Sequence, residues 1–240
     1  MKPNQADNQI EEEHLLNFVV NTLDEELPIE LADSVKVSSE KLYEVLAGAS
    51  ASGTSVNHIC ETTDNSPHAN TVRGHLTDQF DLDTVEQVGD TLLQRDTVDT
   101  LPDRPVEVVA DLHLDPYYGD EDETEALYSS LAKRGTTTFH AYATLYARVR
   151  NKRYTLAVRQ LVAGETSGDV LGEFLELLDG LDLSVKAVYL DRGFYNSTCL
   201  GLLYAYNYAY VIPVVKWSET IKDEHSSGWS RVIEQRVSWE

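Results

Sequence analysis

The sequence predicts an α/β protein in which an all-helical N-terminal region precedes a domain of alternating strands and helices. Apolar residues recur at helical spacing up to the stretch DTLPDRP, residues 99–105, and strand-like apolar runs begin only after it. Two of those runs, residues 106–110 and 185–190, are each followed directly by an aspartate, Asp111 and Asp191. We therefore expect a helical region over residues 1–100 and a sheet domain over residues 105–240.

The composition indicates a folded and very acidic protein. Of its 240 residues 42% are hydrophobic, and 41 Asp and Glu against 19 Lys and Arg give a formal net charge of −22. Because such a surface repels itself unless salt screens it, the composition favours a halophilic protein over an ordinary acidic one. The two cysteines, Cys60 and Cys199, form no CxxC motif, which argues against a disulfide framework and a zinc site. No stretch has the length and apolarity of a membrane span or a signal core, so we expect a cytoplasmic protein.

The N-terminal region is expected to contain four helices. The first covers residues 10–27, and the second begins at a serine cap, Ser38 or Ser39. A short third helix follows. The fourth is predicted to begin at Pro67, with Ser66 as its N-cap, because proline costs nothing at the first helical position.

The third and fourth of these helices follow the pattern of a helix-turn-helix over residues 54–77. On the fourth helix the apolar residues are expected to face inward, which leaves Arg73 and His75 outward. In a helix-turn-helix this second helix can lie in a DNA major groove. Short helix pairs in small all-α bundles show the same pattern, and a single arginine supplies few phosphate contacts. A purely structural helical bundle is therefore an open alternative.

A second candidate nucleic-acid surface lies in residues 126–164, which contain no Asp or Glu. The basic residues of this segment are Lys133, Arg134, Arg148, Arg150, Lys152, Arg153 and Arg159. Alternation predicts two long strands, residues 138–149 and 154–162, joined at RNKR in a hairpin. The charge could serve only to protect a sheet edge from aggregation. In a chain this acidic, we favour contact between the cations at the turn and a nucleic-acid backbone.

After the hairpin, the pattern predicts a helix capped by Ser167 or Asp169, the strand at residues 185–190, a helix over 197–206 and a strand in YAYVIPVV. This order, with an aspartate after the first and the fourth strand, resembles the ribonuclease H-like fold. In that fold the two strands are neighbours in one mixed sheet. The resemblance therefore implies that Asp111 and Asp191 lie close together.

The stretches ADLHLDPYYGD and VYLDRGFYN resemble the first and second acidic motifs of DDE transposases. The similarity is to insertion-sequence transposases of the haloarchaeal type and the related insertion-sequence-four group, over residues 105–216. It implies Asp111 and Asp191 as catalytic metal ligands, with Mg²⁺ or Mn²⁺ as the cofactor. It also implies element ends and target DNA as partners and an N-terminal DNA-binding region. Arg192, directly after Asp191, could contact a DNA strand near the metals, and a homo-oligomer is left open.

The third acid of that family, a Glu in a Tyr-x2-Arg-x3-Glu-x6-Lys pattern, is not found in that pattern here. The candidates for its role are Glu219, Glu224, Glu234 and Glu240. We therefore expect a C-terminally truncated or decayed transposase that binds DNA and cleaves it inefficiently. Two alternatives are open: a ribonuclease H-like nuclease or resolvase, and a non-catalytic derivative that occupies the element ends and represses transposition.

Overall fold

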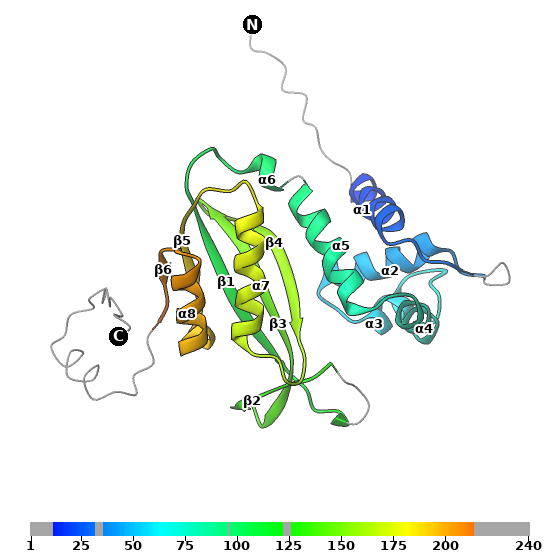
Figure 1. Ribbon diagram of the computed structural model, residues 1–240. Helices are drawn as coiled ribbons and strands as arrows, with labels where there is room; N and C mark the ends of the chain where they lie inside the picture. The colour runs from blue at the N-terminus through cyan, green and yellow to red at the C-terminus, as the bar shows by residue number, and fades with distance from the viewer. Residues whose placement is uncertain (1–11, 32–35, 96, 122–125, 214–240) are drawn as a thin grey trace, which may run out of the picture. The chain divides into compact units, whose positions relative to one another are not determined.

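The computed structural model describes residues 12–31, 36–95, 97–121 and 126–213 (Figure 1). The chain divides into two compact units, residues 1–91 and residues 92–240, which are described separately below. Within the described ranges, no helix combines the length and the apolar character needed to cross a lipid bilayer.

The first unit is a group of helices. They are α1 (Glu12–Glu26), α2 (Ser39–Ser52), α3 (Val56–Thr62), α4 (Ala69–Gln79) and the larger part of α5 (Leu82–Arg95). Helices α1, α2 and α4 share a core that includes Val20, Leu42, Tyr43, Val45 and Val72, and residues of α3 pack against it. Ser38, one of the two predicted caps, is the N-cap of α2, and its side chain accepts a hydrogen bond from the N–H of Lys41.

Helix α4 begins two residues later than the sequence predicts. Its N-cap is His68, whose Nδ1 accepts the N–H of Asn70 at 3.3 Å, so Ser66 and Pro67 precede the helix. Histidine is not among the residues that N-caps prefer, which explains why the sequence pattern pointed to the serine instead.

The second unit is built on a six-stranded mixed sheet. Its elements are α6 (Thr97–Thr100), β1 (Val106–Pro116), β2 (Tyr128–Lys133), β3 (Thr136–Val149), β4 (Lys152–Leu161), α7 (Ser167–Gly180), β5 (Val185–Leu190), the 3₁₀ turn η2 (Arg192–Phe194), α8 (Ser197–Ala205) and β6 (Tyr210–Val211).

The strands lie in the order β4-β3-β1-β5-β6, and β2 pairs with the other end of β3. Strand β1 is antiparallel to β3 and parallel to β5, and β5 is parallel to β6. The first strand and the strand after α7 are therefore parallel neighbours in a mixed sheet, as a ribonuclease H-like fold requires. The predicted fold class is confirmed.

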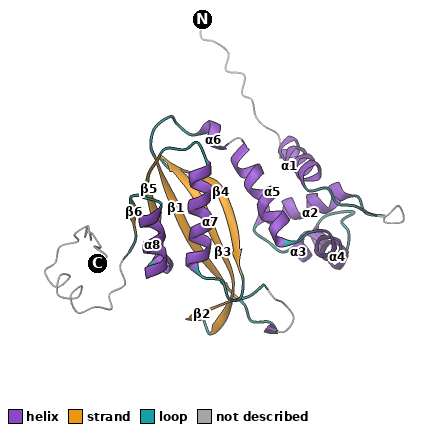
Figure 2. Ribbon diagram, viewed as in Figure 1, coloured by secondary structure: helices purple, strands orange, loops and turns teal. Residues whose placement is uncertain are grey.

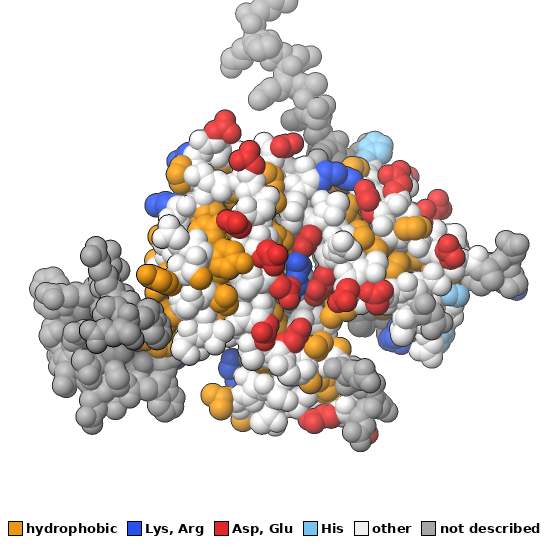
Figure 3. Space-filling view, in the orientation of Figure 1, with side chains coloured by type: hydrophobic (Ala, Val, Ile, Leu, Met, Phe, Trp, Pro, Cys, Tyr) orange, Lys and Arg blue, Asp and Glu red, His pale blue; other side chains and the backbone are white. Residues whose placement is uncertain are grey.

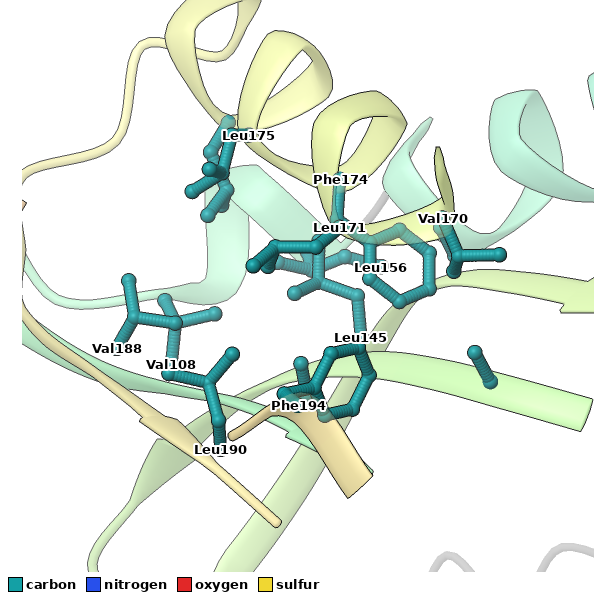
Figure 4. Close-up of a cluster of buried hydrophobic side chains, with 14 of the residues drawn as sticks. Val108, Leu145, Leu156, Val170, Leu171, Phe174, Leu175, Val188, Leu190 and Phe194 are labelled. Atoms are coloured by element: carbon teal, nitrogen blue, oxygen red, sulfur yellow. The ribbon is translucent and has the colours of Figure 1, made fainter. Parts of the chain in front are cut away.

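Helices α7 and α8 cover one face of this sheet (Figure 2). Along β1, β3 and β5 every second side chain points into the core beneath these helices, as a period of two requires. Figure 4 shows Val108, Leu145 and Leu190 of the sheet meeting Leu171 and Phe174 of α7. We call this side the covered face.

The start of α7 differs by one residue from the prediction. Thr166, and neither Ser167 nor Asp169, is the N-cap, and its side chain accepts the N–H groups of Gly168 and Asp169. In return, the carboxylate of Asp169 accepts a hydrogen bond from the N–H of Thr166 at 2.8 Å, which completes a capping box.

Strand β1 is longer than the sequence predicts. The apolar run ends at Ala110, but the strand continues through Asp111 to Pro116 and pairs with β3 over that whole length. Burial on β1 alternates between buried and half-buried up to Ala110, and Asp111 is the first exposed residue. Asp111 therefore marks the point where the strand leaves the core, but it does not end the strand.

Candidate active site and nucleic-acid interface

The strand register brings Asp111 and Asp191 together. Ala110 of β1 pairs with Leu190, the last residue of β5; Asp111 is the next residue of β1, and Asp191 directly follows β5. The backbone N–H of Asp191 also donates to the carbonyl of Ala110 at 3.3 Å. Because residues paired on parallel neighbours point to the same side, the two carboxylates share one face.

That face is the side of the sheet opposite α7 and α8, and we call it the second face. On β1 it consists of Glu107, Val109, Asp111, His113 and Asp115, which alternate with the core residues. The register adds Thr144 of β3 beside Asp111.

The pKa of Asp191 reflects its partial burial and, to a lesser extent, its closeness to Asp111. Partial burial raises the pKa of Asp191 above the ordinary carboxyl value, and the negative charge of Asp111 raises it further. The N–H of Gly193 and the positive charge of Lys133 act in the opposite direction. Asp191 is therefore a half-buried carboxylate whose charge is poorly compensated, the kind of group that a cation stabilises.

The loop after β5 fixes the orientation of the Asp191 carboxylate. Asp191 caps the turn η2, and its Oδ1 accepts a hydrogen bond from the backbone N–H of Gly193. A Cβ at position 193 would lie 2.9 Å from that same oxygen and 3.2 Å from a methyl carbon of Leu112. Glycine is thus the residue that lets the backbone approach the carboxylate, which explains the Asp-Arg-Gly sequence in physical terms.

Two adjacent carboxylates supply hard oxygen ligands, which fit Mg²⁺ or Mn²⁺. Within the described ranges, no group of three or more His, Cys, Asp or Glu side chains is arranged to hold a metal ion. The four glutamates considered for the third position, residues 219, 224, 234 and 240, lie outside the described residues.

Lys133 is a neighbour of this pair that sequence reasoning did not single out. It ends β2, pairs with Thr136 across a tight turn, and lies close enough to lower the pKa of Asp191. The only signal in the sequence was its place in the acid-free segment. The strand that positions it, YSSLAK, has no clear alternation of apolar and polar residues.

The basic hairpin forms as predicted, with its two-residue turn at Arg150 and Asn151 between β3 and β4. Its turn lies at the end of the sheet where β1 begins, because Arg148 pairs with Glu107. At about 3.3 Å per residue, Arg148 and Asp111 lie about 13 Å apart along the strand direction. By contrast, Arg192 follows Asp191 directly and is exposed. The structure thus brings Arg192, and not the turn of the hairpin, next to the aspartates.

The candidate DNA-binding residues of the first unit lie on α4. Arg73 is exposed, and its Nη1 donates to Oδ1 of Asn70 at 3.0 Å. His75 is half-buried, so the prediction that it is exposed was only partly right. Six residues separate α3 from α4, more than the three or four of a standard helix-turn-helix turn. DNA reading by α4 stays a prediction.

No family model and no curated protein matches this sequence. Among solved structures, the chain is similar to piggyBac transposase in its synaptic complex with hairpin DNA, at 12% identity and a TM-score of 0.43. That match covers 91% of this chain and 51% of the other, so this chain spans about half the length of the piggyBac protein. It is also similar to the Mos1 Strand Transfer Complex, at 11% identity and a TM-score of 0.28, covering 88% of this chain and 69% of the other.

Proposed function

We propose that this chain is a DDE-type transposase of a haloarchaeal insertion sequence, which binds DNA and acts on it by metal-dependent phosphoryl transfer. One observation carries the proposal. Asp111 and Asp191 are far apart in the sequence, yet Asp191, directly after β5, lies beside Asp111 of the parallel neighbour β1, at the point where β1 leaves the core.

In this proposal Asp111 and Asp191 hold Mg²⁺ or Mn²⁺ through their carboxylate oxygens. A bound divalent cation lowers the pKa of an attacking water or hydroxyl and stabilises the leaving oxygen in phosphoryl transfer. The chain itself supplies orientation: the backbone of β1 fixes Asp111, and the N–H of Gly193 fixes Asp191. Arg192, next to the pair, would bind a phosphate of the DNA.

The remaining candidate contacts are assigned to DNA binding away from the metal ligands. Arg73 and His75 would contact the element ends from the helical unit. Arg148, Arg150, Lys152 and Arg153 would hold the DNA backbone at the far end of the second face. The candidates for the third acidic metal ligand are Glu219, Glu224, Glu234 and Glu240.

The experiment is a cleavage assay on terminal-repeat DNA in Mg²⁺ or Mn²⁺. We expect slow, metal-dependent cutting that falls about a hundredfold or more in Asp111→Asn and in Asp191→Asn, because each loses a charged metal ligand. Asp115→Asn is the matched control, since it removes the same charge from the same face, four residues further along β1. Cutting that persists in both active-site variants would refute the proposal.

A non-catalytic DNA-binding role is the second candidate. This role is favoured because, within the described ranges, only two carboxylates lie together at the candidate metal site, whereas the DDE family uses three acids. Glu→Gln variants at positions 219, 224, 234 and 240 separate the two. Loss of cutting in one of them identifies the third ligand, whereas binding to the element ends without any cutting supports the repressor.

A further inference from the structure

The second face carries a row of tyrosines directly beside the aspartates. Val109 of β1 pairs with Tyr146 of β3 on one side and with Tyr189 of β5 on the other. This row lies two residues before Asp111 and Asp191, about 7 Å along the strands. On its other side lies the row of Glu107 and Arg148.

A depression of about 420 Å³ opens at this row. Tyr146, Tyr189 and Val109 give it apolar and aromatic walls, and Arg148, Lys152 and Arg153 give it positive charge. A second depression of about 250 Å³ shares Arg148 and adds Arg104, Arg150 and Lys186. The cations of a strongly acidic chain are thus concentrated here, whereas Figure 3 shows acidic side chains spread over the side that carries α7.

Both tyrosine rings are held in place by charged neighbours. The guanidinium carbon of Arg153 lies 5.1 Å from the centre of the Tyr146 ring. The hydroxyl of Tyr189 donates to Oε1 of Glu107 at 3.3 Å. Among the described residues, Glu107 is the one acid that lines either depression, and Lys186 neutralises it by an ion pair at 3.1 Å. The charges that line the two depressions are therefore net positive, and the aromatic surfaces are preordered.

We propose that this depression binds one unpaired nucleotide of a DNA strand, with its base against Tyr189 and Tyr146 and its phosphate on Arg148, Lys152 and Arg153. The proposal rests on the proposed function, because it places this nucleotide beside the phosphate held at Asp111 and Asp191. The second depression then takes the next phosphate along the same strand.

The chemistry of the lining favours a nucleotide over a free anion. A phosphate needs only the cations and makes no use of the aromatic and apolar walls that Tyr146, Tyr189 and Val109 form. A duplex keeps its bases stacked inside the helix, so only an unpaired or extruded base reaches a recessed aromatic surface. Stacking of a base on an aromatic side chain tolerates any sequence, which suits a site that holds a strand and reads no particular base.

The test compares the affinities of the full chain for two single strands, without divalent metal and at one salt concentration. One strand is an oligothymidine, and the other is an abasic strand of equal length with the same phosphates. We expect the oligothymidine to bind about tenfold more tightly, within the range that base stacking on aromatic side chains provides. Tyr189→Ala should abolish this difference and Tyr189→Phe should retain it. Tyr146→Ala and Tyr146→Phe repeat the comparison independently.

Arg148→Gln should weaken the binding of both strands alike, because it removes a phosphate contact and no base contact. Equal affinity of the unaltered chain for the two strands would overturn the proposal and leave a site for phosphates only. A preference for oligothymidine that survives both Tyr→Ala changes would also overturn it. Neither result touches the metal ligands: a chain that still cuts DNA through Asp111 and Asp191 keeps its proposed function without this pocket.

Discussion

The two faces of the same sheet differ in burial, polarity and charge. On the covered face, Val108, Ala110 and Leu145 are completely buried beneath α7 and α8. On the second face, alternate residues of the same strands include Asp111, Tyr146 and Arg148, which are half-buried or exposed. The even-numbered residues of β1 therefore stabilise the core, and its odd-numbered residues carry the candidate chemistry. Substitutions at two consecutive residues of such a strand should therefore have different effects, one on stability and the other on the candidate function.

The largest expected effect is on the covered face. Leu145→Ala should lower the free energy of unfolding by about 2–5 kcal/mol, because it removes a fully buried side chain and leaves a cavity. Its neighbour Thr144 faces the other way, beside Asp111, so Thr144→Ala should cost about 0.5 kcal/mol. Urea denaturation of both variants measures the difference. Equal losses would mean that the two faces are not distinct.

An effect on affinity is expected at the basic end of the second face. Arg148→Gln should weaken DNA binding several-fold and reduce the slope of log affinity against log salt by about one. Its free energy of unfolding should change by no more than about 0.5 kcal/mol. Titrations by fluorescence anisotropy at several salt concentrations provide the test. An unchanged salt slope would remove Arg148 from the interface.

A smaller effect is expected at the turn of the hairpin. Arg150 has a positive φ of 57°, a conformation that costs a residue with a Cβ about 1 kcal/mol relative to glycine. Arg150→Gly should therefore raise the free energy of unfolding by up to about 1 kcal/mol while it weakens DNA binding. Thermal unfolding and binding titrations on the same protein would show the two changes. A destabilised variant would show that the arginine side chain stabilises the turn.

The smallest effect is expected from the charge of Asp191. Burial and the neighbouring Asp111 raise its pKa in the folded state, so stability is greatest when it is protonated and falls as pH rises through the folded pKa. Without metal, Asp191→Asn should therefore be slightly more stable than the unaltered chain at pH 7. The gain should disappear as pH falls below the ordinary carboxyl pKa. Melting temperatures across that range test this, and a difference that does not change with pH would contradict it.

Much of the sheet could be predicted from alternation and apolar runs, and the shared position of the two aspartates followed from the fold. The extension of β1 past Asp111 was missed because the apolar run ends at Ala110. Leu112 and Leu114 nevertheless continue a period of two that could have revealed it. The Thr166 cap was also readable, since TSGD is a capping-box sequence.

Other features depend on tertiary structure and could not be read in this way. Strand β2 owes its place to pairing with β3, so its sequence gives little sign that Lys133 approaches Asp191. The tyrosine row needs the register of three strands, because Tyr146 and Tyr189 meet only across Val109.

The most direct test of the central claim is calorimetric titration of the unaltered chain with Mn²⁺, in parallel with Asp111→Asn, Asp191→Asn and Asp115→Asn. If Asp111 and Asp191 form one cation site, the unaltered chain and Asp115→Asn should bind Mn²⁺ alike, and each of the other two variants should lose most of that affinity. Equal binding by all four proteins, or loss only in Asp115→Asn, would show that the two adjacent aspartates are not a metal site.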